Sequence, residues 1–127
     1  MAFSSYLDQK ILEKTFLGLD FQVAERWCSL HTADPGKTGA NEAAGGPYAR
    51  LTLAQFAAID DSGTAKRLRN AAVLSFQVPA GTYTHLGVWD SQTAGNFLGD
   101  GPLSAPATVN DGDFVIIREN DLAILQD

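Results

Sequence analysis

Apolar and polar residues alternate along most of this chain with the two-residue period of β-strands. Short alternating or wholly apolar runs are separated by clusters of Gly, Pro, Asn and Asp, a spacing typical of strands joined by tight turns. Seven segments are therefore predicted to be strands: 26–31, 48–56, 71–78, 82–90, 96–103, 114–118 and 122–125. The turn signals between them lie at 34–36, 60–63, 79–81, 91–95 and 110–113.

One segment near the N-terminus has a different period. Tyr6, Leu7, Ile11 and Leu12 fall close to one helical stripe, behind a serine that can cap the first turn. The pattern predicts a helix over about residues 4–15, and Gly18 is expected to end it.

Together these elements predict one mainly β domain over residues 1–127. The chain has 127 residues and is 45% hydrophobic, which is enough for one sizeable core and too little for two ordinary domains. Six or seven short antiparallel strands with regular turns favour a β-sandwich or jelly-roll-like fold, with the one helix at the N-terminus.

Residues 32–47 interrupt the strand pattern. They contain four glycines and two prolines and show no hydrophobic periodicity, so the sequence predicts a long surface loop. Such a loop must order against something or remain mobile, and loops of this kind are often functional. We expect this loop to contact other subunits.

The charge balance argues against nucleic acid and membranes as partners. Fifteen acidic and nine basic residues give a net charge of −6, which repels phosphate backbones and anionic lipid. Lys66, Arg67 and Arg69 form the main basic cluster, interpreted as a solvated face or an interface patch. The N-terminus lacks the pattern of a secretion signal, and no segment approaches the roughly 18 apolar residues of a membrane span.

Residues with catalytic or ligand-binding potential are present but do not form a recognisable site. Gly36-Lys37-Thr38 lacks the preceding glycine and following helix of a phosphate-binding loop. His31 and His85 are not at zinc-site spacings and are interpreted as half-buried strand residues. Cys28 lies in an apolar strand and is expected to be buried and inert. No enzyme activity, metal or cofactor is therefore predicted.

Two weaker alternatives remain open. Asp111 and Asp113 flank Gly112 and could offer oxygen ligands to calcium, although Asn-Asp-Gly-Asp is also ordinary turn chemistry. Four aromatic residues could form an exposed platform for sugar, although aromatic residues in strands are more often part of the core. These residues are Trp27, Tyr48, Tyr83 and Trp89.

Several strings of residues together resemble a family of small phage proteins commonly labelled tail fibre or minor virion proteins. The resemblance rests on the segments WCSLHTADPG (27–36), GANE (39–42), GGPYAR (45–50), VPA (78–80), THLGVWD (84–90), GNFL (95–98) and VNDGD (109–113). It spans nearly the whole chain in order, and the Ser-Ser-Tyr-Leu start of the helix fits as well. The basic 66–69 segment departs from the small residues that the family would have there.

This resemblance implies a structural protein of the bacteriophage virion, assembled in the host cytoplasm. It would serve as a capsid decoration or cement protein, or as a head or tail appendage, through contacts with major capsid or tail proteins and with copies of itself. By analogy with other phage appendages, a trimer is the expected oligomer. The alternative is a carbohydrate-binding module at the tail tip. The residues hypothesised to make subunit contacts are Tyr6, Asp34, Lys37, Asn41, Glu42, Tyr48, Arg50, Lys66, Arg67 and Arg69.

Overall fold

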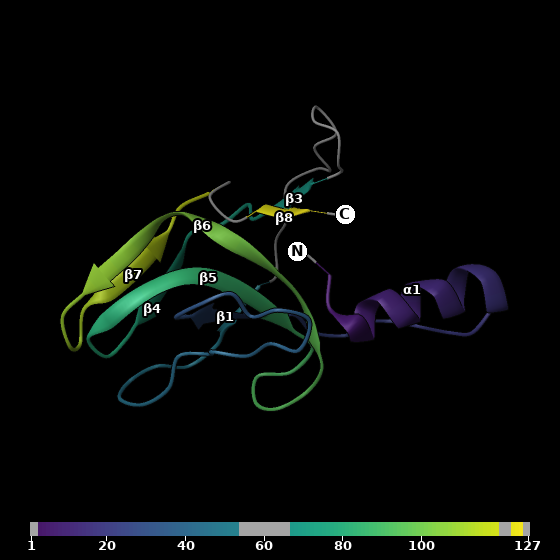
Figure 1. The fold of residues 1–127 in the computed structure, drawn as a ribbon, viewed down its shortest axis with the longest axis horizontal. Helices are drawn as coiled ribbons and strands as arrows, with labels where there is room; N and C mark the ends of the chain where they lie inside the picture. Colours follow the sequence, from purple (N-terminus) through teal and green to yellow (C-terminus); the bar gives the residue numbers. More distant parts are fainter. Residues whose placement is uncertain (1–2, 54–66, 120–122, 126–127) are drawn as a thin grey trace.

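A computed structural model of the chain describes residues 3–53, 67–119 and 123–125 (Figure 1). The elements, in chain order, are α1 (Ser5–Leu17), β1 (Trp27–His31), β2 (Leu51–Thr52), β3 (Arg67–Arg69), β4 (Leu74–Gln77), β5 (Gly81–Trp89), β6 (Phe97–Val109), β7 (Phe114–Ile117) and β8 (Ala123–Leu125). Among the residues described, no helix is long and apolar enough to cross a membrane.

Helix α1 begins and ends where local chemistry dictates. The Ser4 hydroxyl accepts a hydrogen bond from the Leu7 amide at 3.0 Å, which satisfies one of the unpaired donors of the first turn. Gly18 takes φ of 69°, a left-handed conformation that glycine adopts without steric cost and that closes the helix. The predicted cap and stop are confirmed, and the helix runs two residues further than predicted.

The strands form antiparallel sheets that enclose one apolar core. The largest sheet has the order β2-β1-β5-β6, and two further pairs are β4-β7 and β3-β8. Leu30, Leu86 and Val88 of the large sheet belong to the same buried cluster as Phe76 and Val115 of the β4-β7 pair. Two sheets sharing one core is a sandwich-like arrangement. The predicted class, mainly β and antiparallel with a single N-terminal helix, is confirmed.

Three strands differ from their predictions. β3 was not predicted, because its short stretch Arg-Leu-Arg offers a single apolar residue; it pairs with β8. β6 runs on to Val109 instead of ending near 103, and it tolerates Pro102 and Pro106 because it lies at the edge of its sheet, where a missing amide leaves no ladder bond unmade. β2 covers only two residues of the predicted 48–56. The rest of that segment from 54 onward, and the predicted turn at 60–63, lie outside the described residues.

A β-bulge changes which face of β5 one residue occupies. Strict alternation would put Tyr83 on the face of His85 and Trp89. The pairing with β6 shifts between Tyr83 and His85, and Tyr83 joins the core with 3% of its surface exposed. Its hydroxyl donates to the Pro79 carbonyl at 2.8 Å. Tyr83 therefore belongs to the core, as aromatic residues in strands more often do.

Cys28 lies at the centre of this core, fully buried as predicted. Burial raises the pKa of its thiol, so the reactive thiolate does not form at neutral pH. We expect the native protein to resist a thiol reagent such as dithionitrobenzoate and to react with one equivalent after unfolding in guanidinium. Rapid labelling of the native protein at a rate independent of denaturant would contradict this placement.

Candidate functional site

The face of the large sheet that turns away from the core is covered by the loop 32–47. Pro35 and Gly39 of this loop are buried. An added Cβ at Gly39 would lie 2.7 Å from a ring atom of Trp89 and 2.9 Å from one of Phe97. Since the loop lies in direct contact with side chains of β5 and β6, it forms a second packed layer of this domain.

Beneath the loop, a chain of hydrogen bonds crosses β1 and β5. Trp89 Nε1 donates to Ser29 Oγ at 2.9 Å, and Ser29 Oγ lies 2.7 Å from His31 Nε2. His31 Nδ1 lies 2.8 Å from the Ala40 carbonyl oxygen. Because a carbonyl only accepts, Nδ1 carries the proton and Nε2 accepts from the serine. The chain fixes the loop backbone to the sheet.

Ser29 and His31 have the spacing of a nucleophile beside a base, but their surroundings are those of a structural pair. Both side chains are fully buried. Burial lowers the pKa of His31, which keeps the imidazole neutral. Its second nitrogen faces a backbone carbonyl instead of the carboxylate that orients a catalytic histidine. The arrangement can hold a loop, and it presents no surface to a substrate.

A second network ties the loop to the segment that precedes β2. Arg50 donates from Nε and Nη2 to the two carboxylate oxygens of Glu42, each at 2.8 Å, and Tyr48 donates to the same carboxylate at 2.7 Å. Tyr48 in turn accepts from the Leu30 amide at 3.1 Å. The sequence hypothesis grouped Glu42, Tyr48 and Arg50 as contacts with other subunits; the structure brings all three together within one subunit.

The same arginine also holds the β5–β6 hairpin. Its Nη1 donates to the carbonyls of Ser91 and Ala94 at 2.9 and 2.8 Å, and its guanidinium carbon lies 3.9 Å from the centre of the Trp89 ring. A planar fork with five donors suits this combination of bidentate pairing, carbonyl contacts and stacking. Arg50 therefore links the loop, the hairpin and the sheet.

The environment of Glu42 and Tyr48 sets their protonation. Burial by itself would raise the pKa of Glu42, but hydrogen bonds from Arg50 and Tyr48 outweigh it and hold the pKa below its ordinary value. Burial raises the pKa of Tyr48, which remains a neutral donor. The network is thus one carboxylate, one guanidinium and one phenol, each in its ordinary charge state at neutral pH.

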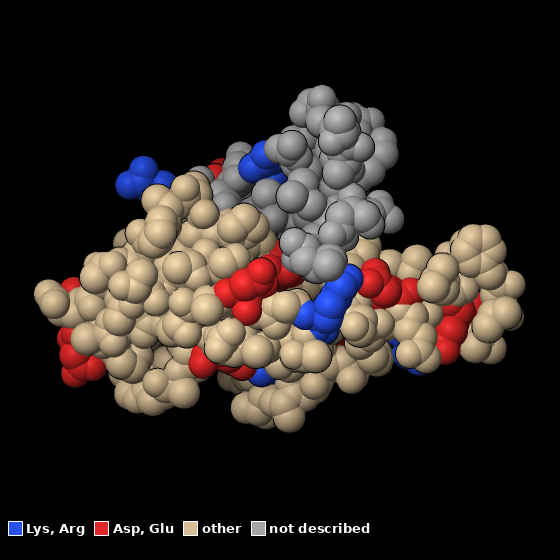
Figure 2. Space-filling model, in the orientation of Figure 1, with Lys and Arg blue, Asp and Glu red and all other residues tan. Residues whose placement is uncertain are grey.

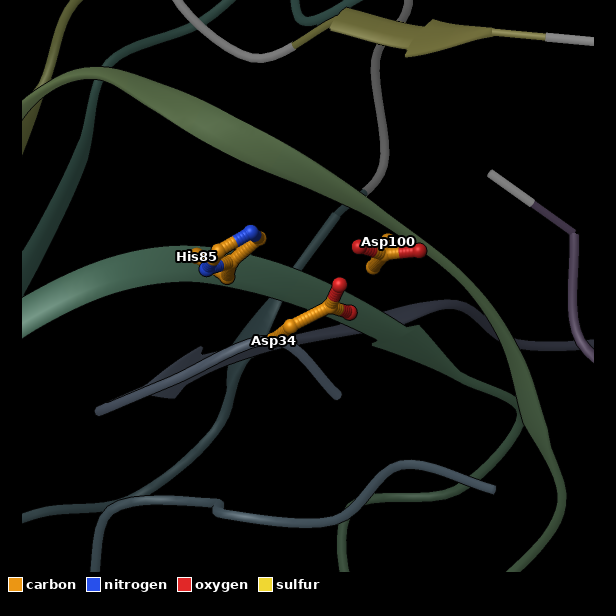
Figure 3. A group of neighbouring side chains, drawn as sticks. All are labelled: Asp34, His85 and Asp100. Carbon is orange, nitrogen blue, oxygen red and sulfur yellow. The ribbon is translucent and has the colours of Figure 1, made fainter. Parts of the chain in front are cut away.

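Three possible metal ligands converge where the loop meets β5 and β6 (Figure 3). Asp34 follows β1, His85 lies on β5 and Asp100 on β6, and one ligand atom from each lies within 4.8 Å of the others. Asp100 is buried, with 4% of its surface exposed, whereas Asp34 is exposed and His85 half-buried. Thr84 Oγ1 lies 2.8 Å from His85 Nδ1. Figure 3 shows both carboxylates pointing into the same space as the imidazole.

The remaining hypothesised contact residues lie in different places. Lys37 donates to the Phe3 carbonyl and to Asp8, each at 2.9 Å, and so joins the loop to α1. Asn41 donates to the Asp34 carbonyl at 3.1 Å within the loop. Four others complete the set. Tyr6 packs edge-on against Phe21, Arg69 lies half-buried on β3, and Lys66 lies outside the described residues. Arg67 is the first residue of β3.

Three of the four aromatic residues weighed as a sugar platform are engaged by neighbours within the fold. Tyr83 is buried in the core, and Tyr48 stacks on Phe76 with ring centres 6.2 Å apart. Trp89 lies between Phe97 and the Arg50 guanidinium. At the other weighed site, the Asp113 carboxylate accepts from the Asn110 amide at 3.1 Å, the bonding of a turn.

The outer face of α1 carries exposed apolar side chains. No residue of the helix is buried. Leu12 and Phe16, one helical turn apart, expose 58% and 76% of their surfaces, and Leu17 and Leu19 are also exposed. In Figure 1 the helix extends away from the sheets, and Figure 2 shows its far end standing clear of the body. The visible face in Figure 2 carries scattered charges and no continuous basic stripe over the described residues.

Comparison with known proteins bears on the whole chain. A family model described as Podophage GP4 fiber I protein gp80 matches residues 2–125. A search of curated proteins found no match. The family model covers nearly every residue, and it agrees with the resemblance seen in the loop and hairpin segments. The chain therefore belongs to the family of podophage GP4 fiber I protein gp80, a family of phage fibre proteins, and is a component of the virion.

Proposed function

We propose that this protein is a non-enzymatic subunit of a phage fibre, attached to a neighbouring virion protein by the outer face of α1. The family description supports a fibre appendage over a capsid cement protein. The observation that carries the mode of attachment is the exposure of Leu12 and Phe16 on a helix that buries none of its residues. Contiguous exposed apolar side chains of this kind mark interaction sites.

The first turn of the helix is bonded to the rest of the fold. Phe3 pairs with Gly99, the Ser4 amide donates to the Leu98 carbonyl at 2.9 Å, and the Ser5 amide donates to the Lys37 carbonyl at 3.2 Å. These bonds fix the first turn against β6 and the loop. The later turns carry the exposed apolar residues, so the fold presents them at a fixed angle to a partner.

The partner we infer is a different protein that offers an apolar groove. Leu12 and Phe16 lie one turn apart on α1, whereas Leu19 follows the Gly18 cap and lies outside the helix. Two apolar positions do not make a coiled-coil heptad seam. A helix of 13 residues gives less than the three to four heptads, about 21 to 28 residues, over which such a seam is normally sustained. Contact between copies of α1 alone is therefore too small to hold an assembly, and a helix seated in a groove buries more of each side chain.

Replacing both Leu12 and Phe16 by glutamine is expected to abolish incorporation into virions and leave the fold intact. The side chains contact solvent, so stability should change by less than about 0.5 kcal/mol. Loss of two apolar anchors from an interface should cost about 2 kcal/mol or more each. The measurement is the amount of the protein in purified virions, by quantitative immunoblot, beside a urea unfolding curve of the isolated variant.

Lys14→Gln is the matched control, since Lys14 lies exposed on the opposite side of the helix. It should incorporate normally. Normal incorporation of the double variant would overturn the attachment proposal. Copy number separates the two placements on the particle, because a fibre subunit is present in tens of copies or fewer and a capsid decoration protein in hundreds.

Trimeric assembly, contacts with major capsid or tail proteins and assembly in the host cytoplasm remain parts of this proposal. Light scattering on the purified protein measures whether it is a trimer. Receptor binding by exposed aromatic residues has little support, because Tyr83 is buried, Tyr48 stacks on Phe76 and the Arg50 guanidinium lies over the Trp89 ring.

A further inference from the structure

We propose that Asp34, His85 and Asp100 bind one divalent first-row transition-metal ion, such as Zn²⁺. The proposal goes beyond the attachment of the subunit and does not depend on it. It starts from the fact that three potential ligands from three separate segments converge to within 4.8 Å.

The position of each ligand follows from the fold. Gly87 on β5 pairs with Asp100 on β6, and His85 lies two residues before Gly87 on the same strand. The side chains of His85 and Asp100 therefore lie on one face of the sheet. The loop then brings Asp34 over that face. Its Oδ1 accepts from the Gly36 amide at 2.8 Å, which fixes the carboxylate at the start of the loop.

The donor set indicates the class of ion. An imidazole nitrogen with carboxylate oxygens suits Zn²⁺ and its first-row neighbours, whereas Ca²⁺ and Mg²⁺ prefer oxygen ligands throughout. Thr84 Oγ1 engages His85 Nδ1 at 2.8 Å, which leaves Nε2 as the nitrogen available to a cation. Metal-binding histidines are commonly oriented through their second nitrogen in this way.

The burial of the three residues also suits an ion that enters from solvent. Asp100 forms the floor with 4% exposure, and Asp34 forms the exposed rim. Two carboxylates held this close repel one another, and a divalent ion would offset that repulsion. Three protein ligands leave a position for water or for a group from a neighbouring subunit. The bound ion would join the loop to β5 and β6.

The test is a titration of the tag-free full-length protein, stripped with chelator, with Zn²⁺ in a calorimeter, followed by thermal unfolding with and without the ion. One Zn²⁺ should bind per chain and raise Tm. Ca²⁺ and Mg²⁺ should bind at least about 10-fold more weakly. Absence of saturable one-to-one binding would overturn the proposal.

Variants locate the site. His85→Gln should weaken Zn²⁺ binding about 100-fold or more and remove the shift in Tm. Circular dichroism shows whether His85→Gln folds. If it does not, Asp34→Asn is the second test of the site, because its side chain keeps an acceptor for the Gly36 amide and so preserves the loop. Asp111→Asn, at an exposed turn, is the control and should bind Zn²⁺ as the native protein does. Undiminished binding by Asp34→Asn and His85→Gln would place the ion elsewhere and refute the site.

Discussion

Replacing Gly39 by alanine is expected to destabilise the fold by about 3 kcal/mol or more, one of the two largest effects we predict. Gly39 has φ of 82°, and a side chain in this left-handed region costs about 1–2 kcal/mol. The new methyl group would also lie 2.7 Å from Trp89 and 2.9 Å from Phe97. These rings pack against each other at 5.1 Å and cannot both retreat, and overpacking of this kind costs a further 1–3 kcal/mol or so.

Gly36→Ala separates the two causes. Gly36 lies in the same loop with φ of 66°, but an added Cβ there meets nothing within 4 Å. The Gly36→Ala variant should lose only the stability that corresponds to the backbone strain, about 1–2 kcal/mol. Urea unfolding of both variants measures the difference. Equal losses would show that the loop does not press on Trp89 and Phe97, and that our description of it as a packed layer is mistaken.

The strands that could be predicted are those whose environment is local. Leu74–Gln77 alternates between buried and exposed residues along its length, as an apolar-polar period predicts. β3 could not be predicted, because its position depends on pairing with β8, more than fifty residues later in the chain. The helix was predicted from Tyr6, Leu7, Ile11 and Leu12, yet its outward face was not, since Leu12 in that stripe is exposed.

The candidate metal site shows why side-chain convergence was harder to predict than strands. The hairpin at 91–95 could be recognised, and Trp89 does pair with Phe97. Counting back from that pair places Asp100 opposite Leu86, on the core face. A bulge shifts the pairing by one residue, so Asp100 lies opposite Gly87 on the other face, near His85. A one-residue shift of this kind leaves no clear trace in the alternation.

The loop is ordered by contacts within the subunit, and its contact with other subunits stays a prediction. Its composition predicts an irregular surface segment, and that part is confirmed. The bonds that order it come from residues distant in sequence: His31 to Ala40, Arg50 to Glu42, and Trp89 against Gly39. A deletion of residues 36–46 would remove all of these contacts.

Replacing Arg50 by methionine is expected to cost about 3 kcal/mol or more, the second of the two largest effects. The arginine side chain is only 8% exposed, and its removal leaves the half-buried Glu42 carboxylate without its cation. It also ends the bonds to Ser91 and Ala94 that hold the hairpin. The double variant Arg50→Met/Glu42→Gln should lose about 1 kcal/mol or more less stability than the two single variants lose in sum, because it has no unpaired buried charge.

The pH dependence of stability gives a sharper test of the same pair. In the native protein the pKa of Glu42 lies below its ordinary value of 4.5. The contribution of the Glu42 carboxylate to folding stability is therefore complete above pH 4.5 and is lost as the pH falls through the lowered pKa. In Arg50→Met, burial is no longer outweighed by the arginine and the pKa should rise above the ordinary value. The folded variant then binds more protons than its unfolded chain, so its stability should increase on acidification from pH 7 toward 5. Urea unfolding across this range, with Arg50→Met/Glu42→Gln as control, measures the Glu42 contribution. If Arg50→Met and the control changed in parallel, burial of Glu42 would not govern its protonation, and the network would be a surface ion pair of little consequence for the fold.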